Sequence, residues 1–119
     1  MVVDADERVR ESLTGLLCIG ERLTVVGSAG ETADALDLAA DQHPDIVIID
    51  PRLPENDGGV TFIQRLRETV PGVRIIGMSR SDGEVDAALA ACFDGFVRKT
   101  FRPNDLQSAI LGADGAAAG

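Results

Sequence analysis

Aromatic side chains are scarce in this chain, which has four Phe and neither Trp nor Tyr among its 119 residues. Hydrophobic residues still make up 45% of the sequence, so the core must be built from Val, Ile, Leu and Ala. A chain of this length favours one domain with its own core. We assign residues 1–112 to that domain and residues 113–119, which are rich in Ala and Gly, to a flexible tail or the start of a linker.

Basic residues are also few, with 11 Lys and Arg against 20 Asp and Glu, and the formal net charge is −9. Such an acidic domain has no electrostatic footprint for direct contact with nucleic acid and is repelled by anionic membranes. No run of about 18 apolar residues is present, which argues against a transmembrane helix. Residues 1–4 lack the basic and apolar regions of a signal peptide, so we expect a cytoplasmic location.

The chain has little metal-binding or disulfide potential, since it contains two Cys and one His. Cys18 and Cys92 are too far apart in sequence, with too few partners, to indicate a zinc site or a disulfide framework. We predict that both are reduced thiols in the core. His43, which precedes Pro44, is predicted to be a solvated surface residue.

Short apolar stretches alternate strictly with helical patterns along the chain. Strands are predicted over residues 1–4, 23–28, 45–50, 73–78 and 95–98. Helices are predicted from residue 6 or 7 to 18, and over 31–42, 60–69, 83–91 and 104–111. This alternation predicts an α/β fold with helices on both faces of a parallel sheet. Five strands favour a flavodoxin-like three-layer sandwich with strand order 2-1-3-4-5 and five helices.

The central stretch is residues 46–59, where four buried-type apolar residues end abruptly at Asp50. Two prolines and two glycines follow, so Asp50 is placed at the carboxyl end of a strand, facing a loop. Ligands bind at that edge of open α/β sheets, although an Asp there can also simply cap a turn. The ends of the first, fourth and fifth predicted strands carry Asp4, Ser79 and Lys99, so four polar groups are expected to converge.

Phosphoryl transfer onto a carboxylate is the chemistry that these four groups suggest. A carboxylate such as Asp50 can act as the nucleophile and form an aspartyl phosphate. Mg²⁺, usually bound through one or two carboxylates and waters, would neutralise the phosphoryl oxygens. Lys99 and Ser79 would supply a cation and a hydrogen-bond donor to the same oxygens.

Over nearly its whole length the chain resembles the receiver domain of bacterial two-component response regulators. Residues 50–58 are similar to the phosphoacceptor stretch of that family, with Asp50 as the acceptor. Ser79 matches its hydroxyl position, Phe96 its switch aromatic and Lys99 its lysine. Residues 99–106 are similar to those of a subgroup that often carries a helix-turn-helix output domain.

The resemblance implies a sensor histidine kinase as phosphoryl donor and Mg²⁺ bound by Asp4, Asp50 and the backbone carbonyl of Arg52. It further implies that Ser79 moves toward the phosphate and that Phe96 turns inward. The face of the fourth helix, fifth strand and last helix would then repack and change partner, often by forming a homodimer. A DNA-binding output domain would lie outside this chain. Such a domain is no conventional enzyme, and at most catalyses its own phosphorylation and dephosphorylation.

Two positions depart from the family pattern. The family usually has two adjacent acids after the first strand, and here they are Asp4 and Ala5. Asp6 could replace the missing metal ligand, or it could cap the following helix. We therefore expect weakened Mg²⁺ binding. Arg80, after Ser79, could clamp the phosphate, narrow access to the acceptor, or be a solvated loop residue.

These departures leave two functions open, a phosphorylatable receiver and a pseudo-receiver that binds partners without phosphate. A minor alternative is a haloacid-dehalogenase-type phosphohydrolase, because residues 2–6 also resemble the start of that family. Asp4 would then be the nucleophile and Asp6 the acid/base. That family needs an acidic pair after its lysine, which this chain lacks, and the alternative leaves residues 50–58 unexplained.

Overall fold

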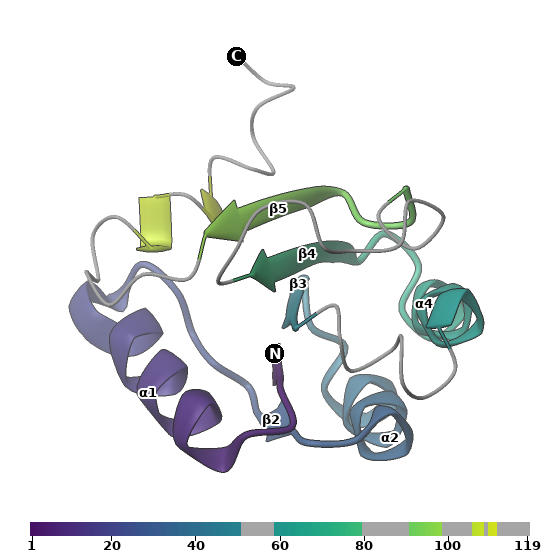
Figure 1. The fold of residues 1–119 in the computed structure, drawn as a ribbon, viewed down its shortest axis with the longest axis horizontal. Coiled ribbons are helices and arrows are strands. Elements are labelled where there is room, and N and C mark those ends of the chain that lie inside the picture. The colour runs from purple at the N-terminus through teal and green to yellow at the C-terminus, as the bar shows by residue number, and fades with distance from the viewer. Residues whose placement is uncertain (51–58, 80–90, 99–105, 109, 112–119) are drawn as a thin grey trace.

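The structure is a computed structural model, and it describes residues 1–50, 59–79, 91–98, 106–108 and 110–111. Its strands form one parallel sheet in the order β2-β1-β3-β4-β5 (Figure 1). Their bounds are Val2–Val3 (β1), Ser28–Ala29 (β2), Ile46–Ile49 (β3), Arg74–Ser79 (β4) and Gly95–Arg98 (β5). The predicted flavodoxin-like fold and strand order are therefore confirmed.

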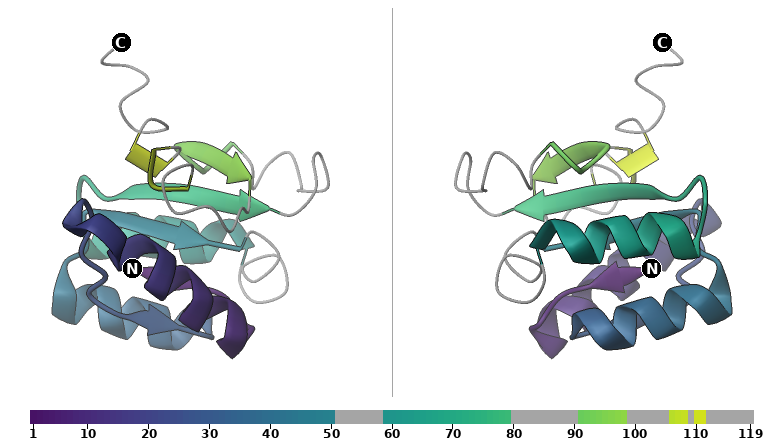
Figure 2. Two further views of the ribbon diagram at one scale, coloured as in Figure 1. Left: turned by 90° about the vertical axis from the view of Figure 1, so that its left-hand side faces the viewer. Right: turned by 90° about the vertical axis from the view of Figure 1, so that its right-hand side faces the viewer.

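Helices cover both faces of the sheet. They are α1 (Glu7–Cys18), followed by the short 3-10 helix η1 (Ile19–Glu21), then α2 (Thr32–Gln42) and α4 (Gly59–Thr69). Residues 106–108 and 110–111 are also helical. Figures 1 and 2 show α1 and these last helical residues on one face, with α2 and α4 on the other. The helix predicted over residues 83–91 and the start of the last helix lie outside the described residues.

Local signals in the sequence account for the helix ends. The side chain of Asp6 accepts a hydrogen bond from the backbone N–H of Arg8 and caps α1 at its N-terminus. Gly20 adopts φ 81 just beyond the end of α1, where a residue with a Cβ would be strained. α2 ends at exposed His43, whose left-handed backbone (φ 48) precedes Pro44.

Two apolar layers hold the sheet between the helices. The layer under α2 and α4 includes Val47, Ile49 and Phe62, and the layer under α1 includes Leu13, Leu17 and Ile48. Alternate residues of β3 therefore enter opposite layers, as expected for a strand covered on both faces. No helix among the described residues has the length and apolar character needed to span a bilayer.

Two sequence-based predictions about the first third of the chain are corrected. The strand predicted over residues 23–28 is present only as Ser28–Ala29, because its neighbour β1 is itself only Val2–Val3 and pairs with nothing further upstream. Cys18 is exposed rather than in the core, since α1 directs Leu13 and Leu17 inward and the next residue points about 100° away. Cys92 is half-buried.

Polar clasps join the elements at positions that sequence patterns do not reveal. The amide of buried Gln107 donates to the carbonyl oxygens of Leu16 (2.8 Å) and Ile19 (2.7 Å), at the end of α1. These two hydrogen bonds satisfy carbonyl groups that a helix C-terminus leaves without intrahelical partners. It also fastens the last helical segment to α1.

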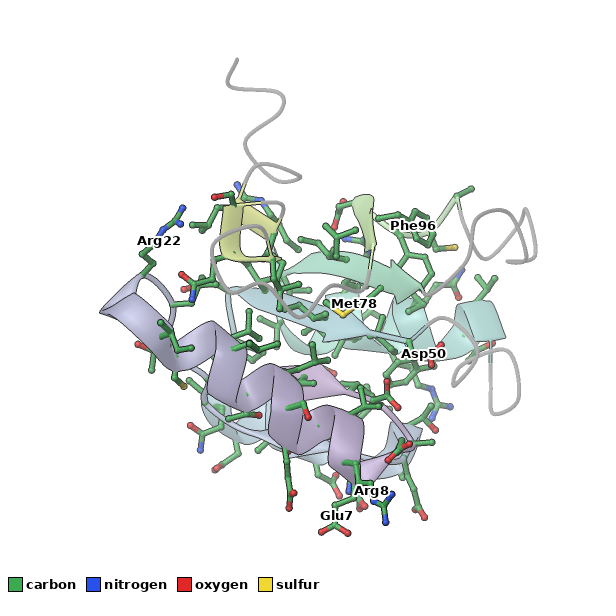
Figure 3. All side chains as sticks on the ribbon, turned by 60° about the vertical axis from the view of Figure 1, so that its left-hand side comes forward. Glu7, Arg8, Arg22, Asp50, Met78 and Phe96 are labelled. Carbon is green, nitrogen blue, oxygen red and sulfur yellow. The ribbon has the colours of Figure 1, made fainter. Side chains whose placement is uncertain are left out.

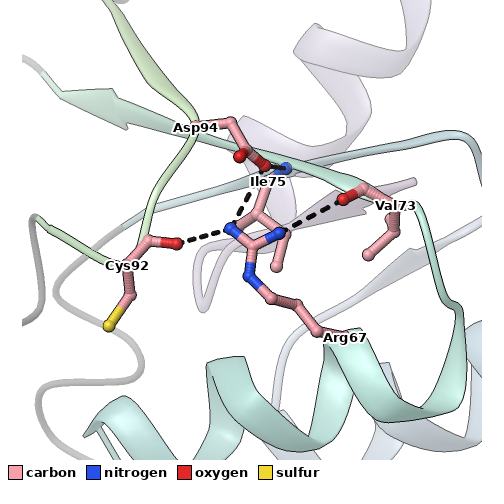
Figure 4. Close-up of polar contacts among 5 residues, drawn as sticks. All are labelled: Arg67, Val73, Ile75, Cys92 and Asp94. Carbon is pink, nitrogen blue, oxygen red and sulfur yellow. Dashed lines mark hydrogen bonds and ion pairs between the residues drawn. The ribbon is translucent and has the colours of Figure 1, made fainter.

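A second clasp ties α4 to the strands β4 and β5 (Figure 4). Arg67 donates to the carbonyl oxygen of Cys92 at 2.6 Å and pairs with Asp94 at 3.2 Å. The same Asp94 oxygen accepts the backbone N–H of Ile75 at 2.8 Å. Since the Arg67–Asp94 pair is more than one-third exposed, its backbone hydrogen bonds contribute more to stability than its charges do.

Candidate functional site

Two buried carboxylates lie side by side at the carboxyl edge of the sheet. Asp4 follows β1 and Asp50 follows β3, and each is less than one-tenth exposed. In the register of these neighbouring strands Val3 lies beside Ile49, so Asp4 and Asp50 occupy the next paired positions. The Asp50 backbone N–H donates to the Val3 carbonyl at 3.1 Å, which continues the ladder to this level. Figure 3 shows Asp50 at this edge.

The loop after β1 is held by hydrogen bonds from both sides. The Oδ1 of Asp4 accepts the backbone N–H of Asp6 at 2.9 Å, and Arg10 Nη1 donates to the Asp4 carbonyl oxygen at 2.6 Å. Asp6 is exposed, and its Oδ1 accepts the Arg8 N–H at 2.9 Å. The sequence left two roles open for Asp6, metal ligand and helix cap, and in the structure Asp6 is the N-cap of α1.

The donor set at this edge fits Mg²⁺, which proteins usually hold through one or two carboxylates with waters completing the shell. Asp4 and Asp50 supply two adjacent carboxylates, while Ala5 is exposed and has no donor side chain. Across the described part of the chain, no group of three or more His, Cys, Asp or Glu side chains is placed to hold a metal. A cation here would therefore have fewer protein ligands than a site with a third acid.

The structure describes only some of the remaining predicted site residues at this edge. Ser79 ends β4, and its register partner is Arg98, the last residue of β5. Lys99 follows directly in the sequence. The side chain of Ser79, and Arg52, Arg80 and Lys99, lie outside what the structure describes.

Phe96, on β5, packs its ring against the neighbouring strand β4. Its register partner on β4 is buried Gly77, and a Cβ built on Gly77 would collide with the Phe96 ring. The ring also packs edge-to-face on Phe93, with centroids 5.0 Å apart at 72°. Even so, Phe96 is 43% exposed, and it is one of three large hydrophobic residues found on the described surface.

Sequence reasoning missed two contributors to this region. Arg10 fixes the carbonyl of Asp4, and the signal for it was its position one helical turn after the cap Asp6. Gly77 makes room for Phe96, and the signal was a glycine inside an otherwise apolar strand, which often marks a close approach.

Comparison with known proteins identifies the family. A model of the response regulator receiver domain matches residues 1–111. The nitrate/nitrite response regulator protein NarL of Escherichia coli K12 is 31% identical over 112 residues, covering 92% of this chain and 51% of that protein. The transcriptional activator DevR/DosR of Mycobacterium tuberculosis is 32% identical over 111 residues, with 92% and 51% covered. The chain thus spans about half the length of these curated relatives.

Solved structures agree with this assignment. The receiver domain of a NarL response regulator from Mycobacterium tuberculosis superposes with a TM-score of 0.75 at 27% identity, covering 96% of this chain and 94% of that one. A LuxR-family response regulator from Aurantimonas gives 0.77 at 29% identity, with 97% and 84% covered. The chain belongs to the response regulator receiver domains of two-component systems.

Proposed function

We propose that this receiver domain accepts a phosphoryl group on Asp50 from a sensor histidine kinase. The observation that carries the proposal is the pairing of buried Asp4 and Asp50 on neighbouring strands. An oxygen of the Asp50 carboxylate attacks the phosphorus of a phosphohistidine, and the bond between phosphorus and imidazole nitrogen breaks. An acyl phosphate forms, and the kinase imidazole recovers its lone pair.

Asp4, Asp50 and the backbone carbonyl of Arg52 would hold Mg²⁺, which supplies charge neutralisation for the phosphoryl oxygens. Lys99 and Ser79 would bind the same oxygens from the ends of β5 and β4. Arg80, which follows Ser79 in the sequence, would add a second cation. The Asp6 N–H orients the Asp4 carboxyl group before any ligand arrives, and Arg10 holds the backbone carbonyl of Asp4.

The switch surface would include Phe96 on β5, together with the fourth and last helices. The Phe96 ring is 43% exposed and contacts Gly77 on β4 and one edge-to-face partner, Phe93, so few side chains oppose a change of its position. Its movement would couple phosphorylation to a change of partner, with a second copy of the chain as one such partner. The relative DevR/DosR, a DNA-binding transcriptional activator, also suggests a DNA-binding output domain beyond this chain.

A pseudo-receiver is the second candidate, and one observation favours it. Ala5 stands where the family usually has an acid, and the nearby Asp6 is used as the cap of α1. A site with only Asp4 and Asp50 as its carboxylates would bind Mg²⁺ weakly and could signal through a constitutive partner instead. The two functions differ in whether Asp50 gains phosphate.

Incubation with acetyl phosphate and Mg²⁺, followed by intact-protein mass spectrometry, tests the proposal. We expect one phosphoryl adduct that disappears in Asp50→Asn and persists in the matched variant Asp37→Asn, which removes the same charge from an exposed position on α2. No adduct on a folded protein would favour the pseudo-receiver. An adduct that survives Asp50→Asn would refute the assignment of the acceptor.

A further inference from the structure

Arg10, in the first part of α1, donates two hydrogen bonds to the turn that follows β1. Its backbone N–H binds the Asp6 carbonyl oxygen at 3.0 Å, and its Nη1 binds the Asp4 carbonyl oxygen at 2.6 Å. The second bond is charge-assisted and therefore stronger than a bond between neutral groups. Since the Asp6 N–H in turn donates to Asp4 Oδ1 at 2.9 Å, Arg10 supports the turn from which the Asp4 carboxylate projects.

Gly30, just after β2, holds the guanidinium of Arg10 from the other side. A Cβ built on Gly30 would lie 2.5 Å from Arg10 Nη1 and 3.2 Å from its Cζ, so only a glycine allows this close approach. Ala29, the preceding residue, accepts the backbone N–H of Asp4 at 3.1 Å. Residues 29–30 thus support Asp4 twice, directly through Ala29 and indirectly through Arg10.

The direction of the Arg10 side chain is set by this local packing rather than by attraction to the nearest acids. A groove of about 520 Å³ between α1 and β2 is lined by Glu7, Arg10, Glu11, Thr14, Gly15 and Ser28. Both glutamates are exposed, and within the described part of the chain neither forms an ion pair with Arg10. The guanidinium turns to a backbone carbonyl of the metal-binding turn instead.

We propose that Arg10 is a positioning residue for Mg²⁺ and that its contact with Gly30 keeps Asp4 in the orientation that binds the ion. This inference rests on the proposed function, because it takes Asp4 and Asp50 as the metal-binding pair. Ala5 supplies no donor side chain, so the ion has few protein ligands and depends strongly on how each is held. Groups that orient a metal ligand contribute about tenfold to hundredfold to affinity.

The positive charge of Arg10 acts on Mg²⁺ in the opposite direction. A guanidinium bound to the Asp4 carbonyl oxygen repels a cation at the Asp4 carboxylate, so charge alone predicts that removing Arg10 tightens binding. Gly30→Ala separates the two effects, because its methyl group displaces the flexible end of Arg10 and leaves the charge in the protein. The backbone of Gly30 is outside the left-handed region, so it accepts alanine.

Isothermal titration of the folded variants with Mg²⁺ tests the proposal. We expect Gly30→Ala to weaken binding about tenfold, and Arg10→Met to weaken it by a smaller factor, since lost repulsion offsets part of the effect. In the Arg10→Met background Gly30→Ala should add nothing, because the contact is already gone. The matched control Gly27→Ala adds a methyl group to the same segment, against Leu38 of α2, and should bind like the parent.

Three outcomes of the titration would overturn the proposal. Gly30→Ala could bind Mg²⁺ like the parent, its effect could persist in full in the Arg10→Met background, or Arg10→Met could bind more tightly. Asp50→Asn separates these outcomes from the proposed function. If it abolishes binding while Gly30→Ala does not weaken it, the metal site stands and the role of Arg10 is refuted. If Asp50→Asn binds like the parent, the metal site itself is wrong, and positioning at that site is refuted with it.

Amide hydrogen exchange of Asp6 gives a readout that needs neither Mg²⁺ nor phosphate. Its N–H donates to Asp4 Oδ1, so its exchange rate reports how firmly that carboxylate is held. We expect faster exchange in Gly30→Ala than in Gly27→Ala, with the free energy of unfolding measured for both. Equal protection of this amide in the two variants would show that Arg10 and Gly30 do not position Asp4.

Discussion

At the scale of single residues, three ionisable groups lie where a change of one charge should alter stability or ion binding. They are the Met1 amino group and the carboxylates of Asp4 and Asp50. The Met1 amino group is mostly buried and donates to the Ile46 carbonyl. Asp4 and Asp50 bring two carboxylates together at the other end of the same strands. Both ends of β1 therefore bind or bury charge, and both are open to test by substitutions that alter one group.

Stability is predicted to rise with pH between about 6 and 8. Folding lowers the pKa of the Met1 amino group from 8.0 to about 6, so the folded state binds this proton less tightly than the unfolded state. Protonation then costs about 2–3 kcal/mol below pH 6, and the cost is lost as pH rises through 8. Urea unfolding across this range measures the effect.

Acetylation of the amino group provides the control, because it removes the titrating group and should flatten this component of the pH profile. Asp45, Arg22 and His43 line the cavity beside the Met1 amino group. His43→Gln leaves the amino group in place and should keep the pH dependence. If the profile flattened in His43→Gln and not on acetylation, the Met1 assignment would be wrong.

Ala5→Asp is predicted to tighten Mg²⁺ binding at least about tenfold. Ala5 is exposed beside Asp4, so an added carboxylate gains attraction to a divalent ion with little burial cost. Ala5→Asn supplies an oxygen of similar size without the charge and should give a smaller gain. Isothermal titration with Mg²⁺ measures both. Equal affinities for the parent and Ala5→Asp would place the ion away from this loop.

At the scale of elements, β4 and β5 contain one unusually close contact, between Gly77 and the ring of Phe96. Gly77 lies opposite Phe96, whose ring occupies the space that a side chain would take. Glycine inside a strand normally weakens it. Here it allows an aromatic ring to lie over a buried strand while remaining partly exposed, and this combination suits a side chain that changes position.

Gly77→Ala is predicted to destabilise the domain by about 1–3 kcal/mol, because the new methyl group displaces the Phe96 ring. In a Phe96→Ala background the same substitution should be neutral or stabilising, since the clash is gone and alanine suits a strand better than glycine. Chemical unfolding of the four proteins in this cycle measures the coupling. Additive effects would mean that the ring does not depend on Gly77.

The sequence predicted helices better than strands, for reasons visible in particular residues. Asp6, Gly20 and Pro44 act within one helical turn, so α1 and α2 begin and end close to where expected. A strand depends on its neighbour instead. Residues 23–27 have a strand pattern, but β1 is too short to pair with them, and only Ser28–Ala29 qualify.

The candidate site, like the fold, could be predicted from the sequence only in part. Strand ends brought Asp4 and Asp50 to one edge, as their positions after apolar runs implied. The role of Asp6 was not decidable, since a cap and a metal ligand both place an Asp at that position. Contact between Phe96 and Gly77 requires the β4–β5 register, which spacing along the chain does not give.

At the scale of the whole molecule, the charge of −9 and the paired carboxylates predict that folding is sensitive to divalent cations. Any ion that binds the folded state alone raises the free energy of unfolding by linkage. Mg²⁺ at about ten times its dissociation constant should contribute about 1.4 kcal/mol. Diffuse screening of an acidic protein also stabilises it, so the site-specific part has to be separated from the general part.

Variants that remove one carboxylate each make this separation. Asp4→Asn and Asp50→Asn should lose most of the Mg²⁺-dependent rise in melting temperature, because each removes half of the paired donor set. Asp37→Asn removes the same charge from exposed α2 and should keep it. Melting curves with Mg²⁺ and with NaCl of equal ionic strength measure the difference. If all three variants respond like the parent protein, Mg²⁺ acts on this domain only through its net charge, and the edge between β1 and β3 is not its binding site.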